Sequence, residues 1–112
     1  MSVANAVARL SGAARPDSFV ISSGVLMHVD GRLPSVESNV PSLRGTRVPG
    51  LLVAHRQDAC RYTPARDVPR FKRWLGAEAS IEEIHVDGGG PPRGEACGAR
   101  HFHGFEGIDA EV

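Results

Sequence analysis

The sequence predicts a small α/β fold with about three parallel strands flanked by helices. Short apolar runs alternate along the chain with segments whose apolar residues recur at helical spacing, a pattern typical of parallel strands joined by right-handed crossovers. The 112 residues have room for one domain with a core but not for two, so we treat residues 1–112 as a single domain. Three parallel strands need helices on both faces, and the sequence offers little more than two helices.

The first half of the chain predicts a helix, a strand and a long connection. Residues 2–10 place apolar side chains at i, i+3, i+4 and i+7, and Ser2 is a suitable N-cap. The apolar run at residues 19–21 predicts a buried strand, which ends at serines and a glycine. Residues 30–47 are polar and interrupted by Pro34, Pro41 and Gly45, so we expect an irregular connection there.

The second half predicts two further strands with a helix between them. We expect strands at residues 48–54 and 81–86, and an amphipathic helix at residues 66–75 that Gly76 closes. A loop rich in glycine and proline follows the third strand. Residues 107–112 have the pattern of the first turn of another helix.

The composition argues against several classes of partner. Thirteen Lys and Arg residues balance thirteen Asp and Glu residues, which favours neither nucleic acid nor an anionic membrane. No apolar run approaches the roughly 20 residues of a membrane span. The first ten residues lack the pattern of a signal peptide, and the run at residues 88–90 lacks the Lys-Ser/Thr of a phosphate-binding loop. We therefore expect no cofactor, and the localisation stays open.

An acid and a histidine follow two of the predicted strands. Asp58 comes just after the second strand, and His103 lies in the long loop after the third. Because ligands of open α/β sheets bind outside the carboxyl ends of the strands, we expect the two side chains to meet. In a catalytic triad, the histidine takes a proton from a nucleophile while the acid orients the ring.

Three stretches carry a family resemblance. They are Leu-Leu-Val-Ala-His-Arg-Gln-Asp-Ala-Cys-Arg-Tyr-Thr-Pro at residues 51–64, Asp-Gly-Gly-Gly-Pro-Pro-Arg-Gly-Glu-Ala-Cys at 87–97, and His-Phe-His-Gly-Phe-Glu-Gly-Ile at 101–108. They resemble the C-terminal third of α/β-hydrolase-fold proteins, and in particular a bacterial subgroup with Asp-x-Cys after the acid strand. In that subgroup a second cysteine precedes the His-Gly-Phe/Tyr motif. Residues 2–5 are similar to the start of the helix that follows its nucleophile turn.

The resemblance implies a partial α/β-hydrolase fold with Asp58 as the triad acid and His103 as the base. The implied reaction is hydrolysis of a small-molecule ester or other acyl bond by a serine. That serine belongs to a Gly-x-Ser-x-Gly turn, which this sequence lacks. We therefore expect a hydrolase piece truncated at both ends, inactive alone, which self-associates or pairs with a missing N-terminal half. Ser22 and Ser23 are the other positional candidates, and turn residues are the better interpretation of both.

The resemblance also implies a disulfide between Cys60 and Cys97, because the subgroup has both positions. Such a bond would indicate an oxidising compartment, and so a periplasmic or secreted whole protein. One alternative is a zinc-stabilised small domain, for which Cys60, Cys97, His101 and His103 have the right chemistry but no short Cys-x₂₋₄-Cys spacing. Another is a small non-catalytic binding or oligomerisation module.

Overall fold

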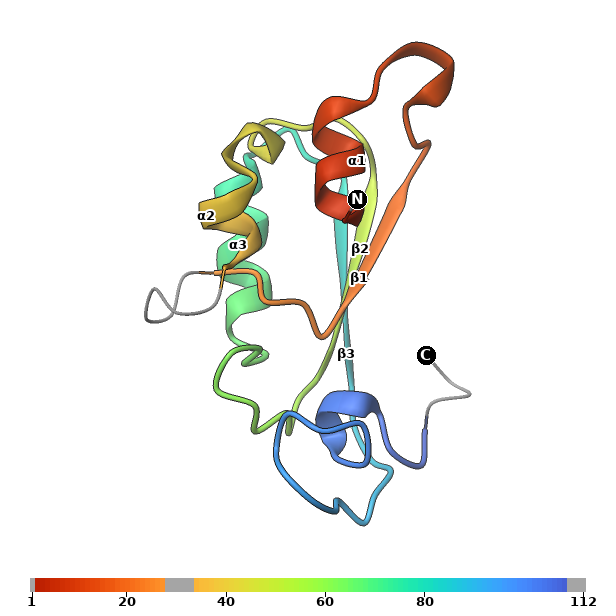
Figure 1. Cartoon of the computed structure of the whole chain (residues 1–112), viewed down its shortest axis with the longest axis vertical. Helices are drawn as coiled ribbons and strands as arrows, with labels where there is room; N and C mark the ends of the chain where they lie inside the picture. The colour runs from red at the N-terminus through yellow and green to blue at the C-terminus, as the bar shows by residue number, and fades with distance from the viewer. Residues whose placement is uncertain (1, 28–33, 109–112) are drawn as a thin grey trace.

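A three-stranded parallel sheet in the order β1-β2-β3 forms the centre of the computed structural model, which describes residues 2–27 and 34–108 (Figure 1). The strands are β1 (Phe19–Ser22), β2 (Gly50–His55) and β3 (Ile81–Val86). The α-helices are α1 (Val3–Arg9), α2 (Val36–Asn39) and α3 (Asp67–Leu75), and the 3₁₀ turns are η1 (Gly12–Ala14), η2 (Pro41–Leu43) and η3 (Phe102–Gly104). The α/β class and the parallel sheet are confirmed.

The pairing register aligns the polar ends of the strands at one edge of the sheet. Phe19 pairs with Gly50, and Gly50 pairs with Ile81, so the three strands begin level with one another. β2 and β3 run on together for six residues, to His55 and Val86. The segments that follow β2 and β3 therefore leave the sheet side by side, which brings distant parts of the sequence together.

All three helices contribute to one core on a single face of the sheet. Leu52 and Ala54 of β2 point into this core, together with Phe71 and Leu75 of α3 and Val7 of α1. The expectation that helices cover both faces is therefore not met within the described residues. The physical reason is that the crossovers between the strands return on the same side.

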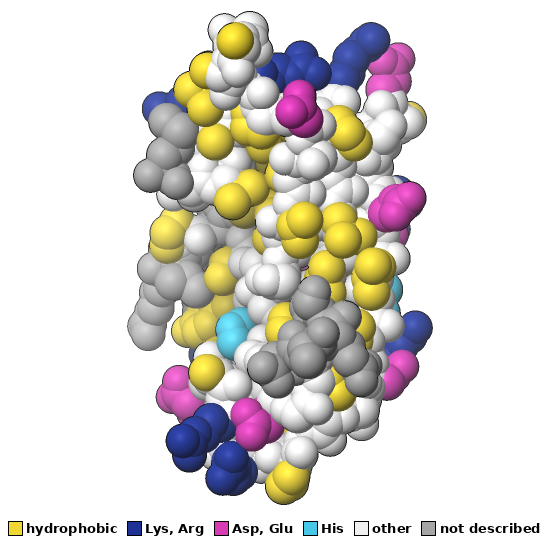
Figure 2. Space-filling view, turned by 90° about the vertical axis from the view of Figure 1, so that its right-hand side faces the viewer, with side chains coloured by type: hydrophobic (Ala, Val, Ile, Leu, Met, Phe, Trp, Pro, Cys, Tyr) yellow, Lys and Arg dark blue, Asp and Glu magenta, His cyan; other side chains and the backbone are white. Residues whose placement is uncertain are grey.

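Within residues 2–27 and 34–108, the opposite face is covered only at one end. There Val53 packs against Phe105 and Ile108, which follow η3. Val20 of β1 and Ile84 of β3 are 55% and 44% exposed. Figure 2, which views the molecule from the right-hand side of Figure 1, shows apolar side chains in yellow on this surface. Part of the sheet thus presents an open apolar face.

The element boundaries follow local capping chemistry. Ser2 caps α1 as predicted, with its hydroxyl accepting a hydrogen bond from the Asn5 amide. The predicted irregular connection at 30–47 is wrong in part, since it contains α2 and η2. Ser35 and Ser38 form a reciprocal capping box that starts α2. The prolines on either side of this short helix favoured the prediction of a loop.

Two expectations fall partly outside the described residues. Residues 30–33 of the connection and residues 109–112 of the expected C-terminal helical turn are not described. The segment 105–108 is a series of turns after η3. None of the helices within residues 2–27 and 34–108 has the length and hydropathy of a membrane span.

Candidate acid–histidine site

The Asp58 carboxylate is held by the turn that follows β2. The Asp58 amide donates to the His55 carbonyl oxygen at 3.1 Å, which closes the turn at the end of the strand. Oδ1 then accepts a hydrogen bond from the Cys60 amide at 2.9 Å. This local bond from side chain to backbone is typical of an Asx turn. The side chain is fully buried, so its remaining oxygen must find a partner inside the protein.

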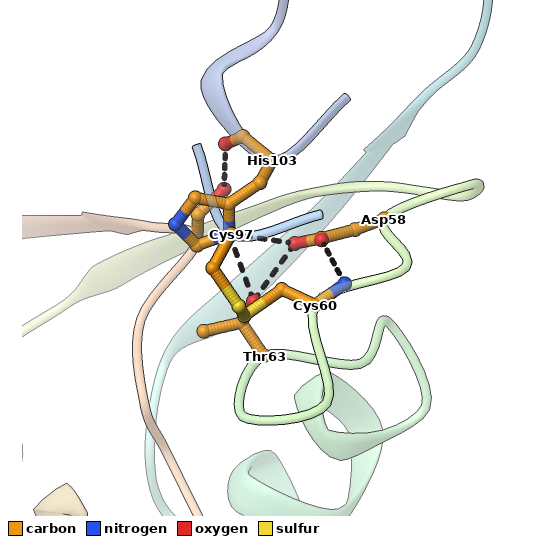
Figure 3. Close-up of a disulfide and its surroundings, with 6 residues drawn as sticks. Asp58, Cys60, Thr63, Cys97 and His103 are labelled. Carbon is orange, nitrogen blue, oxygen red and sulfur yellow. Dashed lines mark hydrogen bonds and ion pairs between the residues drawn. A yellow bond between two sulfur atoms is a disulfide. The ribbon is translucent and has the colours of Figure 1, made fainter. Parts of the chain in front are cut away.

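That partner is the imidazole of His103. Nδ1 lies 3.1 Å from Oδ2 of Asp58, across 45 residues of sequence. Figure 3 shows the second ring nitrogen directed away from the carboxylate. The meeting of Asp58 and His103 that the sequence predicts is therefore present, and it follows from the neighbouring ends of β2 and β3.

Thr63 is a third member of this network, and the sequence analysis missed it. Its hydroxyl oxygen lies 2.9 Å from Oδ2 of Asp58 and 2.9 Å from Nδ1 of His103. The Thr63 amide donates to the Cys60 carbonyl oxygen at 3.1 Å, so one turn positions both Asp58 and Thr63. The sequence showed only a Tyr-Thr-Pro turn, and no spacing rule marks a threonine five residues after an acid.

Ser23 anchors His103 from the end of β1. Its hydroxyl donates to the main-chain oxygen of His103 at 2.8 Å, and its backbone has φ 47°, in the left-handed region. The hydroxyl hydrogen is thus directed at a carbonyl group. Ser22 is exposed at the end of β1. No hydroxyl or thiol within residues 2–27 and 34–108 is hydrogen-bonded to Nε2 of His103.

The Cys60–Cys97 disulfide predicted from the resemblance is confirmed, with an S–S distance of 2.07 Å. It joins the turn that holds Asp58 to the loop that carries His103 (Figure 3). Cys60 is buried and Cys97 partly buried. The disulfide therefore ties the loop that carries His103 to the turn after β2, close to the contact between Asp58 and His103.

A pocket of about 530 Å³ opens beside His103. Its floor includes the disulfide, with Val25, Ala59, Ala96 and Tyr62 around it. Arg61 and Glu95, both exposed, contribute the only charged side chains among its lining residues, all of which are described. The pocket is therefore mostly apolar near the imidazole, with charge at the rim.

The zinc ligand set expected as an alternative is not assembled. Both sulfur atoms are joined in the disulfide, so neither is a thiolate that could bind zinc. His101 packs edge-on against Phe102, and its Nδ1 is buried without a partner. Within the described part of the chain, no three His, Cys, Asp or Glu side chains are placed to hold a metal ion.

His55 has a structural role beside the site. It is completely buried, it stacks on Phe102 with ring centroids 4.5 Å apart, and its Nδ1 accepts a hydrogen bond from the Gln57 amide at 3.0 Å. Nε2 therefore carries the proton and donates to the Gly88 carbonyl oxygen at 2.8 Å. These contacts hold the η3 segment against the end of β2.

In comparisons with known proteins, no family model, curated protein or solved structure matches the chain. What the site can do must come from its own geometry. The arrangement is suited to moving a proton. It combines a buried carboxylate, a histidine with one ring nitrogen on that carboxylate and an adjacent pocket, and no described residue bonds the second ring nitrogen.

Proposed function

We propose that Asp58 and His103 are the acid and base of an α/β-hydrolase-type site that cleaves a small-molecule ester or other acyl bond. One observation carries the proposal: Nδ1 of His103 is bonded to the buried Asp58 carboxylate, while Nε2 has no hydrogen-bond partner among the described residues and lies beside the pocket. The hydroxyl group that attacks the substrate is supplied by a serine outside the residues described here.

The proposed chemistry is a serine-dependent acyl transfer to water. Nε2 of His103 takes the proton of the serine hydroxyl as its oxygen bonds to the acyl carbon, and the imidazolium then gives that proton to the departing alkoxide. A water molecule then attacks the acyl-serine through the same two proton transfers, which releases the carboxylic acid and restores the serine. Asp58 stays ionised throughout and stabilises the imidazolium through Nδ1–H.

The proposal can be tested by restoring the serine. The reading frame before residue 1 is searched for Gly-x-Ser-x-Gly, and the encoded segment is co-expressed with this chain. Turnover of p-nitrophenyl butyrate by the purified pair is expected to fall by about a hundredfold or more in His103→Gln and in Asp58→Asn. His85→Gln, on β3, is the matched control and should keep full turnover, because His85 contacts Glu83 rather than the site.

Two outcomes would count against the proposal. Turnover by the pair that survives both His103→Gln and Asp58→Asn would show that these residues are not the acid and base. Robust turnover by the 112-residue chain alone, lost in His103→Gln, would show that the nucleophile lies within this chain.

A small oligomerisation module is a second candidate, and the open sheet face favours it. Val20 and Ile84 are exposed on the face on which the described part of the chain places no helix, and exposed apolar patches often mark interfaces. A second copy that covers this face would make the chain sediment as a dimer. Val20→Lys with Ile84→Lys should then give a monomer, whereas Val3→Lys, at an equally exposed valine on α1, should not. A monomeric wild-type chain would reject this candidate.

A further inference from the structure

The hydroxyl of Thr63 is shared between the proposed acid and the proposed base. It lies 2.9 Å from each partner atom, and Thr63 is only 4% exposed. We propose that Thr63 is a positioning residue that fixes His103 in the tautomer with hydrogen on Nδ1 and a free electron pair on Nε2. The role in a reaction rests on the proposed function, but the tautomer itself is a property of the folded chain.

The hydrogens available to Oδ2 of Asp58, the hydroxyl oxygen of Thr63 and Nδ1 of His103 allow one arrangement. An ionised carboxylate only accepts hydrogen bonds, so the single hydroxyl hydrogen of Thr63 is directed to Oδ2 of Asp58. The lone pairs of the Thr63 oxygen then face Nδ1 of His103, which must carry a hydrogen to bond with them. Nδ1–H is thus placed between two acceptors, the Thr63 oxygen and Oδ2 of Asp58.

The opposite tautomer fits the same atoms poorly. With hydrogen on Nε2, the bare lone pair of Nδ1 would face the Asp58 carboxylate at 3.1 Å. The Thr63 hydroxyl could then satisfy either Nδ1 or Oδ2, but not both. One acceptor would lose its partner, which is costly because the Asp58 side chain is fully buried and Thr63 is only 4% exposed.

Asp58 does not complete this arrangement alone. Its Oδ1 is taken by the Cys60 amide, and the 3.1 Å contact from Oδ2 to Nδ1 is longer than the roughly 2.7–2.9 Å of a strong charge-assisted bond. The hydroxyl of Thr63 makes the shorter contact to the imidazole. Thr63 therefore supplies a second anchor that limits rotation of the ring.

The experiment compares three threonine variants by ¹⁵N nuclear magnetic resonance of the histidine rings in the 112-residue chain. Thr63→Val removes the hydroxyl while keeping the shape, Thr63→Ser keeps the hydroxyl, and Thr46→Val is the matched control. The Thr46 hydroxyl is likewise hydrogen-bonded, accepting from the Val48 amide, but Thr46 lies outside the site. His55, whose contacts require hydrogen on Nε2, is an internal reference for the opposite tautomer, and His103→Gln assigns the His103 signals.

We expect the Nδ1–H form of His103 in the wild-type chain, in Thr63→Ser and in Thr46→Val. In Thr63→Val the ratio of the Nε2–H form to the Nδ1–H form should rise about fivefold, the size of one net hydrogen bond. A ratio unchanged within about twofold in a folded Thr63→Val would overturn the assignment and leave Thr63 as a packing residue.

The wild-type chain provides a test that needs no variant. A nuclear Overhauser contact between the Thr63 hydroxyl hydrogen and the hydrogen on Nδ1 of His103 is expected, and finding His103 with hydrogen on Nε2 would overturn the proposal even if Thr63→Val did not fold. Failure of the proposed hydrolysis would be seen only in the ester assay, because the tautomer measurement requires no substrate.

Discussion

The hydroxyl of Ser23 donates to the main-chain oxygen of His103 at 2.8 Å, joining the end of β1 to η3 across 80 residues of sequence. This bond fixes the backbone of His103, whereas Asp58 and Thr63 fix its ring. The histidine is therefore held from two sides, by the ends of β1 and β2.

Replacing Ser23 tests the backbone anchor. Ser23→Ala removes the hydroxyl and should lower the free energy of unfolding by about 1 kcal/mol, the net value of one hydrogen bond. Urea denaturation followed by far-ultraviolet circular dichroism gives this quantity. Ser22→Ala is the matched control at the neighbouring, exposed position and should change it by less than about 0.5 kcal/mol. Equal effects of the two substitutions would show that the bond to His103 contributes nothing measurable.

Reduction of the Cys60–Cys97 bond should destabilise the whole fold. The two cysteines are 37 residues apart, and releasing a loop of that length costs about 4 kcal/mol in the chain-entropy model. Guanidinium denaturation with and without dithiothreitol measures the difference. The double variant Cys60→Ser/Cys97→Ser should match the reduced chain and should not respond to dithiothreitol. An intact mass that does not increase by about two daltons on reduction would mean that the bond is absent in solution.

His55→Phe tests the structural role of the second buried histidine. Phenylalanine keeps a ring against Phe102 but leaves the Gly88 carbonyl and the Gln57 amide without partners. The expected loss is about 1–3 kcal/mol, because each of the two lost hydrogen bonds contributes about 0.5–1.5 kcal/mol. His85→Gln, which disturbs only a partly exposed contact with Glu83, should cost no more than about 1 kcal/mol. A His55→Phe chain as stable as the wild type would show that the two hydrogen bonds of His55 add no measurable stability.

Gly104→Ala should displace the loop that carries His103. A methyl group at residue 104 would overlap the backbone of Ala99, which cannot move aside as a flexible side chain could. We expect a destabilisation of about 1–3 kcal/mol, typical of overpacking, and a shift of the His103 ring resonances. Gly98→Ala, in the same loop, meets its nearest atom at 3.1 Å and should have a smaller effect. A Gly104→Ala chain with unshifted His103 resonances would show that residues 99 and 104 are not packed this closely.

The α/β class, the approximate positions of β1, β2 and β3, and helices α1 and α3 could be predicted from the amino-acid sequence alone. Apolar periodicity is local, so it can be read directly from runs such as residues 81–86, where the predicted and observed strand coincide. It also placed Asp58 and His103 after neighbouring strands. The short helix α2 was missed because a capping box between two serines is a weak signal beside two prolines.

The details of the site depend on contacts between segments that are far apart in the sequence. The roles of Thr63 and Ser23 depend on hydrogen bonds over 40 and 80 residues, and no local pattern marks a hydroxyl whose partner lies so far along the chain. The concentration of helices on one face depends on the path of the crossovers, which helical periodicity does not specify. Local sequence sets which segments form strands and helices, but the packing of those segments decides which polar groups meet.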